Sequence, residues 1–160
     1  MAALILTDVP SGFARQPDSI ADTGPTNLAK AVQDEVAANA AQVLRQTGFV
    51  SGYQRAWADA GQVRQDIIFL YRFATAAGAE QYAKNRAAEV RFQSVGPISA
   101  FAVFLPSGIG LHSETADSSF ATVTFAKGVY AVEALSTNGV KEDQSLAAAA
   151  LANAQFQRLP

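Results

Sequence analysis

Residues 120–136 constrain the fold most, because apolar and polar side chains alternate there on both sides of a glycine-containing turn. This pattern is typical of an antiparallel β-hairpin, and Gly128 suits the positive φ of a tight turn. A two-residue turn at Lys127-Gly128 predicts three cross-strand pairs: Phe125 with Tyr130, Val123 with Val132, and Ala121 with Ala134. These six side chains then share one face, and the opposite face carries Thr122, Thr124, Ala131 and Glu133. A slip of one residue would turn the apolar set outward, so the hydrophobic pattern constrains the register.

Apolar residues at helical spacing predict three helices. The first begins at Gly24 or Thr26, ends before Gly48 and spans about 20 residues, or roughly 30 Å. Asp34 and Glu35 are adjacent on it and point in different directions. The second helix follows a capping Thr75, and the third follows a cap at Asp143 or Ser145.

Further strands are predicted at residues 4–7, 49–57, 63–73, 100–105 and 109–113. Residues 13–24 have no sustained period and are interpreted as an ordered loop. The expected fold is therefore α+β, with a mostly antiparallel sheet of five to six strands, about three helices, and the order (β)αββαβββα. The chain is expected to form a single domain over residues 1–160, with residues 1–24 as a short strand and loop leading into it.

Composition excludes several classes of function. The net charge is only −2, which disfavours binding to nucleic acid. The chain has no cysteine and one histidine, so disulfides, thiolate sites and two-histidine metal motifs are absent, and neither a metal nor a cofactor is expected. Neither a membrane span nor a signal peptide is recognisable, so the protein is expected to be cytoplasmic or to begin after a removed export signal.

His112 is the one weak candidate for catalysis. Glu114 and Asp117 lie near it in sequence, and Ser113 or Ser107 could serve as a nucleophile. The competing interpretation is an exposed histidine on a loop or strand end, because the serines lack the frame of a nucleophile elbow.

The strands at 49–57 and 63–73 supply the candidate ligand-binding residues. Arginine forks bind carboxylate or phosphate, and Tyr53 and Trp57, with Tyr71 on the partner strand, could form an aromatic platform. The competing interpretations are cross-strand Arg–Asp pairing on a solvated face and aromatic side chains in the core. The candidates are Arg55, Arg64, Asp66, Arg72, Tyr53 and Trp57.

Three stretches carry a family resemblance: Phe49–Tyr53, Leu70–Thr75 leading into a helix, and Val123–Tyr130 before a terminal helix that ends Gln157-Arg158-Leu159-Pro160. From Phe49 onward the chain resembles small extracytoplasmic domains of actinobacterial lipoproteins and related surface proteins, some with a PsbP-like α/β/α sandwich. The lipid-anchoring cysteine of a lipoprotein is absent here. The resemblance implies a binding or scaffolding role at an extracytoplasmic location, and it supplies no catalytic residue.

The expected function is thus a non-enzymatic binding or interaction module for an unknown protein or small molecule. The alternatives are a small hydrolase or isomerase that uses His112, and a structural protein that assembles into a homo-oligomer. These functions can be told apart by the face of residues 63–73 that carries Arg64 and Arg72. If helices cover this face, a structural or partner-binding role is indicated. If it lines an open cavity of about 300–1,000 Å³, a small ligand is favoured.

Overall fold

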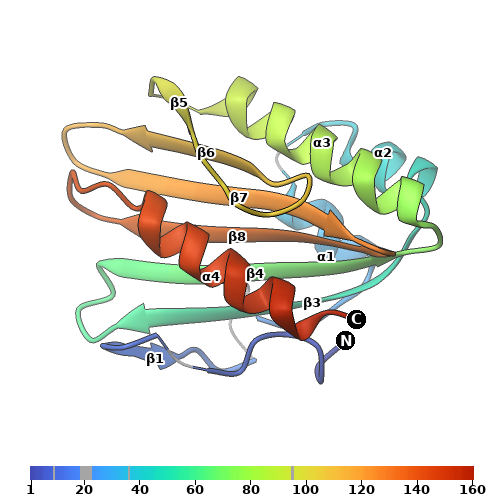
Figure 1. Cartoon of the computed structure of the whole chain (residues 1–160), viewed down its shortest axis with the longest axis horizontal. Coiled ribbons are helices and arrows are strands. Elements are labelled where there is room, and N and C mark those ends of the chain that lie inside the picture. The colour runs from blue at the N-terminus through green and yellow to red at the C-terminus, as the bar shows by residue number, and fades with distance from the viewer. Residues whose placement is uncertain (9, 19–22, 36, 95) are drawn as a thin grey trace.

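The computed structural model describes residues 1–8, 10–18, 23–35, 37–94 and 96–160. Four helices and eight strands follow one another in the order ββααββαββββα (Figure 1). The helices are α1 (Leu28–Asp34), α2 (Ala40–Gln46), α3 (Ala76–Gln93) and α4 (Ser145–Arg158). The strands are β1 (Phe13–Arg15), β2 (Gly24–Thr26), β3 (Phe49–Asp59), β4 (Arg64–Phe73), β5 (Ile98–Phe101), β6 (Ile109–Glu114), β7 (Ser119–Lys127) and β8 (Tyr130–Asn138).

All strands join one antiparallel sheet in the order β1-β3-β4-β8-β7-β6-β5, and β2 pairs with a second stretch of β3. The predicted α+β class and antiparallel sheet are therefore confirmed. The predicted five to six strands and about three helices are wrong, since the structure has eight strands and four helices in the described part of the chain.

Helices cover both faces of the sheet. Figure 1 shows α4 across the front, with α1 and α2 behind. On the α4 side, Trp57, Ile68, Leu70, Val123 and Phe125 belong to one core. On the α3 side, a second core contains Tyr71, Phe73, Ala79, Tyr82 and Leu44. The strand β4 alternates between them, so its even-numbered face, which the sequence left open, packs under α4.

The N-terminal quarter of the chain differs from the prediction. Residues 4–7 form no strand, although Ile5 and Leu6 are buried against α4, where the Gln155 side chain accepts from the Leu6 N–H and donates to the Leu4 carbonyl. The segment interpreted as a loop contributes β1 and β2, each three residues long, and residues 19–22 lie outside the described residues. Three-residue strands are too short to show a period of two.

The first helix is the other correction. The sequence predicts one helix from about 26 to 46, whereas α1 ends at Asp34 and α2 starts at Ala40. Asn27 caps α1 by accepting from the Lys30 N–H, and Glu35 leaves the helix in an extended conformation at φ −89° and ψ 133°.

The hairpin forms as expected, with one adjustment of register. The turn comprises Gly128 and Val129, so Lys127 pairs with Tyr130, Phe125 with Val132, Val123 with Ala134 and Ala121 with Ser136. A shift of two residues preserves the face of every side chain, so the predicted apolar face is the one that packs on α4. The predicted pairs themselves are wrong.

A β-bulge in β3 explains a second difference. The sequence places Phe49, Tyr53 and Trp57 on one side, but the register of β3 on β4 shifts between Phe49 and Ser51. Phe49 therefore packs edge-on against Tyr71 on the α3 side, while Tyr53 and Trp57 lie on the α4 side. One extra residue in a strand has this effect because side chains alternate between faces.

Among the described residues, none of the helices has both the length and the apolar character needed to cross a bilayer.

The contact between the end of α2 and the start of α3 leaves no room for a side chain at Gly78. A Cβ there would lie 2.0 Å from the Thr47 carbonyl oxygen. We expect Gly78→Ala to lower the free energy of unfolding by about 1–3 kcal/mol through overpacking. Gly61→Ala is the matched control, because its Cβ would meet only Val63 Cγ2 at 3.5 Å, and it should change stability by less than about 0.5 kcal/mol. Denaturant unfolding measures both, and equal stabilities of the two variants would contradict the packing.

Candidate functional site

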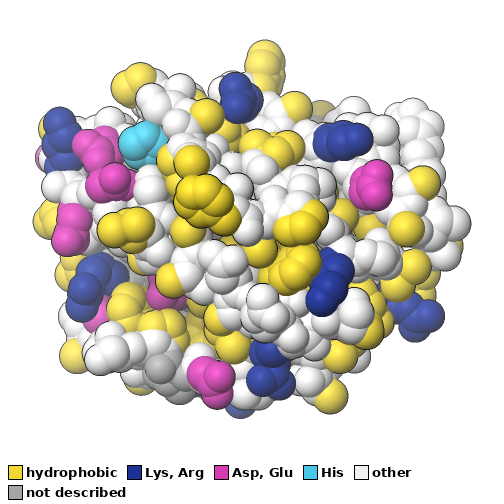
Figure 2. All heavy atoms as spheres, in the orientation of Figure 1, with side chains coloured by type: hydrophobic (Ala, Val, Ile, Leu, Met, Phe, Trp, Pro, Cys, Tyr) yellow, Lys and Arg dark blue, Asp and Glu magenta, His cyan; other side chains and the backbone are white. Residues whose placement is uncertain are grey.

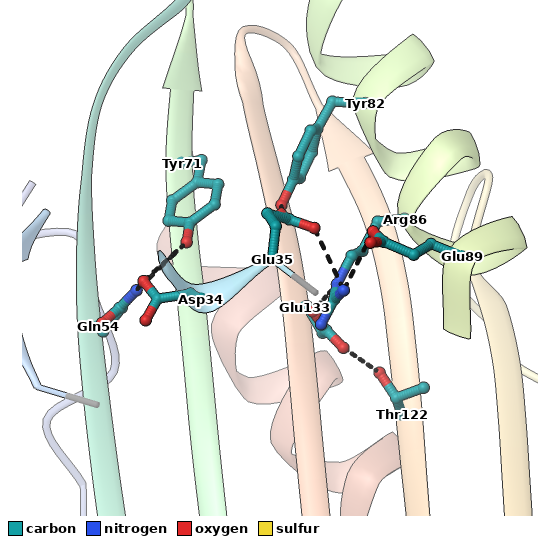
Figure 3. A network of polar contacts seen from close by, with 9 residues as sticks. All are labelled: Asp34, Glu35, Gln54, Tyr71, Tyr82, Arg86, Glu89, Thr122 and Glu133. Atoms are coloured by element: carbon teal, nitrogen blue, oxygen red, sulfur yellow. Dashed lines mark hydrogen bonds and ion pairs between the residues drawn. The ribbon is translucent and has the colours of Figure 1, made fainter. Parts of the chain in front are cut away.

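The most polar part of the interior lies between α3 and the sheet. Because α1 stops at Asp34, the next residue, Glu35, turns its carboxylate towards α3. It accepts hydrogen bonds there from the Tyr82 hydroxyl and from Arg86 Nη1 at 3.2 Å (Figure 3). The end of α1 at Asp34, which the sequence did not predict, thus places the acidic side chain of Glu35 in the interior.

Arg86 is the centre of this group. Its Nε donates to Glu133 of β8 at 2.7 Å, and its Nη1 lies 3.2 Å from both Glu35 and Glu89. Thr122 of β7 donates to the second oxygen of Glu133 at 3.2 Å. The side chains of Arg86 and Glu133 are only 13% and 5% exposed, so their charges are largely removed from water. We call these six residues the Arg86 cluster: Glu35, Tyr82, Arg86, Glu89, Thr122 and Glu133.

Burial and charge determine the protonation of the cluster. Burial raises the pKa of Glu35 to about 8, against the lowering effect of the Arg86 charge. Burial disfavours the charged form of Arg86, but Glu133 and Glu35 outweigh it and raise the Arg86 pKa. Burial also acts to raise the pKa of Glu89, but a hydrogen bond with Glu35 and the charge of Arg86 lower it on balance. Glu35 therefore holds a proton at neutral pH and Glu89 is ionised.

A second polar group adjoins the cluster. The Asp34 carboxylate accepts from the Gln54 amide, and the Tyr71 hydroxyl lies 3.2 Å from the same amide nitrogen (Figure 3). Burial, followed by the charge of Asp34, raises the pKa of Tyr71 well above its ordinary value. Two neighbouring residues at the end of α1 thus anchor it to β3, β4 and α3.

Cavities open on both sides of α3, and Arg86 lines both. The first, of about 310 Å³, lies between α2 and α3, and we call it the α2–α3 cavity. The second, of about 400 Å³, lies between α3 and strands β6 to β8, and we call it the hydroxyl cavity. Six hydroxyl side chains line its wall, next to three apolar residues and the Arg86–Glu133 pair. Its lining is Arg86, Val90, Ser94, Gly96, Ser113, Thr115, Ser118, Ser119, Phe120, Thr122, Glu133 and Leu135.

The three predicted arginines do not form one patch. Arg55 is buried and donates to the Leu6 carbonyl at 2.7 Å. Arg64 and Arg72 are exposed at opposite ends of β4, where Arg64 pairs in register with Asn138 and Arg72 with Tyr130. Asp66 is buried and accepts from Ser136 at 2.6 Å, and burial raises its pKa.

The aromatic candidates are divided between the two faces. Tyr53 and Trp57 belong to the α4-side core, and the Tyr53 hydroxyl donates to Asp18 at 2.8 Å. Tyr71 lies in the α3-side core, so the three rings do not share a platform. Trp57 is fully buried.

Two of the predicted ligand residues do reach a cavity. Arg64 and Asp66 line a space of about 360 Å³ between α4 and the N-terminal segment, together with Leu6, Phe13 and Leu151. The face of β4 that packs under α4 is thus accessible from this cavity at its Arg64 end. Ligand binding by Arg64 and Asp66 stays a prediction.

His112 lies on the α4 side of β6. Its Nδ1 is 3.7 Å from Asp143 Oδ1, and its ring meets Phe101 edge-on. Ser113, the adjacent residue, lines the hydroxyl cavity on the opposite face, so its hydroxyl cannot give a proton to His112 directly. The expected acidic neighbour Glu114 is present, and Asp143 from the start of α4 joins it.

Sequence reasoning named Glu35, Glu133 and Thr122 without grouping them, and it missed Arg86. A signal existed for Arg86, which lies three and four residues from Ala83 and Tyr82 on the apolar stripe of its helix. A charged residue on a buried stripe requires a partner.

The raised pKa of Glu35 makes stability depend on pH. The native state holds this proton more tightly than the unfolded chain, so the free energy of unfolding should fall as pH rises from about 4.5 to about 8. We expect Glu35→Gln, which mimics the protonated form, to reduce this loss by more than about 1 kcal/mol. Denaturant unfolding at both ends of the window measures it.

Glu80→Gln is the control, because Glu80 is exposed on α3, the helix that Glu35 contacts. Asp66, whose pKa is also raised, contributes equally to every variant in the comparison. A Glu35→Gln chain with the pH dependence of the wild type would contradict the assignment.

Comparison with known proteins supports the fold. No family model matches the chain, and no curated protein matches it by sequence. A solved structure, the extracellular domain of PknH from Mycobacterium tuberculosis, superposes with a TM-score of 0.62 at 12% identity, covering 98% of this chain and 93% of that one. At this identity the likeness is one of fold. The neighbour is an extracellular domain from an actinobacterium, which agrees with the actinobacterial, extracytoplasmic part of the resemblance, whereas the PsbP-like sandwich and the lipoprotein type stay predictions.

Proposed function

We propose that this protein is an extracytoplasmic small-molecule binding module and that its ligand occupies the hydroxyl cavity. The observation that carries the proposal is the wall of this cavity, where six hydroxyl side chains adjoin a buried Arg–Glu pair. Its volume of about 400 Å³ suits a small ligand. The extracytoplasmic part of the proposal is supported by the likeness of the fold to an extracellular domain.

The chemistry of the wall selects an uncharged polar ligand. Arg86 and Glu133 neutralise one another, so the wall offers no net charge to an ion. Ser and Thr hydroxyls both donate and accept hydrogen bonds, which suits polyols, sugars and amides. Phe120 and Leu135 supply an apolar surface for the less polar side of such a molecule.

Retention of the Arg86 cluster fits a binding role. Buried ion pairs contribute little net stability compared with well-packed apolar residues, so a buried cluster at a cavity wall is a candidate functional site. Here the Arg86–Glu133 pair lines the cavity, where it would orient a ligand by hydrogen bonds.

The test is an NMR titration of the isotope-labelled chain with a panel of neutral sugars, polyols and amides. We expect at least one compound to shift the backbone resonances of Ser113, Phe120 and Thr122. Val90→Trp, which fills the hydroxyl cavity, should weaken that binding at least tenfold.

Val43→Trp is the matched control, because it makes the same volume change in the α2–α3 cavity. It should leave the affinity unchanged if the variant retains the wild-type spectrum elsewhere. Loss of binding in Val43→Trp alone, or no shifts in these strands with any compound, would overturn the proposal.

A further inference from the structure

A cluster of three metal-ligating side chains lies on the face of the sheet opposite the hydroxyl cavity. We propose that His112, Glu114 and Asp143 bind a divalent first-row transition ion, with Zn²⁺ as the representative. One donor atom from each residue lies within 4.8 Å of the other two. The inference is independent of the proposed function, since it uses neither the hydroxyl cavity nor its residues.

Chain geometry brings the three together. His112 and Glu114 are two residues apart on β6, so their side chains point to the same face as neighbours. Asp143 comes from the segment that enters α4, which packs on that face. Figure 2 shows the single histidine, in cyan, at the surface beside acidic side chains.

The imidazole nitrogen is the strongest pointer to an ion. His112 Nδ1 is buried and lacks a hydrogen-bond partner among the described residues, an arrangement that costs free energy. Its separation of 3.7 Å from Asp143 Oδ1 is too long for a hydrogen bond. Two donors on one tetrahedral zinc ion stand about 3.3 Å apart, so a small closure around an ion would satisfy both atoms.

The start of α4 holds the Asp143 carboxylate in place. Its Oδ1 accepts from the Ser145 N–H at 2.8 Å. The Asp143 side chain is 59% exposed and that of His112 25%, so an ion can enter from solvent and keep water as a further ligand. With neutral His112, the two carboxylates give a charge of −2 that a divalent cation neutralises.

The donor set selects the class of ion. An imidazole nitrogen with two carboxylate oxygens suits zinc and its neighbours in the first transition row, whereas magnesium and calcium prefer oxygen donors throughout. Calorimetric titration of the metal-free full chain with Zn²⁺ should therefore show one site, and Mg²⁺ at the same concentrations should show none.

Three conservative variants test the ligands. His112→Phe keeps a ring against Phe101, Asp143→Asn keeps an acceptor for Ser145, and Glu114→Gln keeps the length of the side chain. Each should weaken Zn²⁺ binding at least tenfold. In wild-type NMR spectra, Zn²⁺ should shift the His112 imidazole resonances.

Asp117→Asn is the control, since Asp117 is an acidic neighbour in sequence that does not belong to the cluster, and its affinity should equal that of the wild type. Zn²⁺ affinity that is unchanged in all three ligand variants would mean a nonspecific surface association and would overturn the site. Absence of one-to-one binding by the wild-type chain, or binding of Mg²⁺ in preference to Zn²⁺, would do the same.

Discussion

The guanidinium of Arg86 is buried, so its charge must be balanced by protein groups and not by water. The packing of α3 on the sheet brings those groups to it. Two carboxylates from separate segments supply the opposite charge, Glu89 on α3 and Glu133 on β8, and Glu35 after α1 accepts a hydrogen bond from Arg86. Glu35 can reach it only because α1 ends at Asp34. Removing one partner of such a buried pair costs about 3–5 kcal/mol, since the remaining charge stays buried. Arg86 is therefore held by groups from three places: the residue that follows the end of α1, α3 itself, and Glu133 in the middle of β8.

Covering both faces of the sheet gives each strand two environments. In β8, Val132 and Ala134 pack against the α4-side core, whereas Ala131 and Glu133 face α3. The same alternation separates the predicted polar surfaces, because Thr122 and Glu133 lie under α3 while Arg64 and Asp66 lie on the α4 side. The two polar surfaces therefore lie on opposite sides of the sheet.

Local patterns in the sequence were sufficient to predict the faces of the hairpin and the start of α3. The alternation in 120–136 predicted which side chains share a face, and Thr75 caps α3 through the Gly78 N–H at 3.0 Å, as expected. The hairpin register was missed because a shift of two residues leaves the hydrophobic pattern unchanged. The break after Asp34 was missed because the apolar spacing continues across it, and Arg86, which Glu35 contacts beyond the break, is remote in the chain.

The candidate sites were harder to predict for the same reason. Glu114 is close to His112 in the sequence, but Asp143 joins them only through the packing of α4 on the sheet. Arg86 meets Glu133 by a similar tertiary contact. Of the six residues proposed for ligand binding, Arg64 and Asp66 reach a cavity, whereas Trp57 and Arg55 are buried. They lie on the face of β3 and β4 that α4 covers, and a periodic pattern alone could not place that helix.

The strand β6 joins the two proposed sites through a single peptide bond. Ser113 lines the hydroxyl cavity on one face, and His112 belongs to the proposed metal site on the other. An ion that stiffens this strand would reduce the entropy lost when a ligand docks on its reverse side. By thermodynamic linkage such an effect is reciprocal. If the ion raises the affinity of the cavity for its ligand by a given factor, the ligand raises the affinity of the metal site for the ion by the same factor.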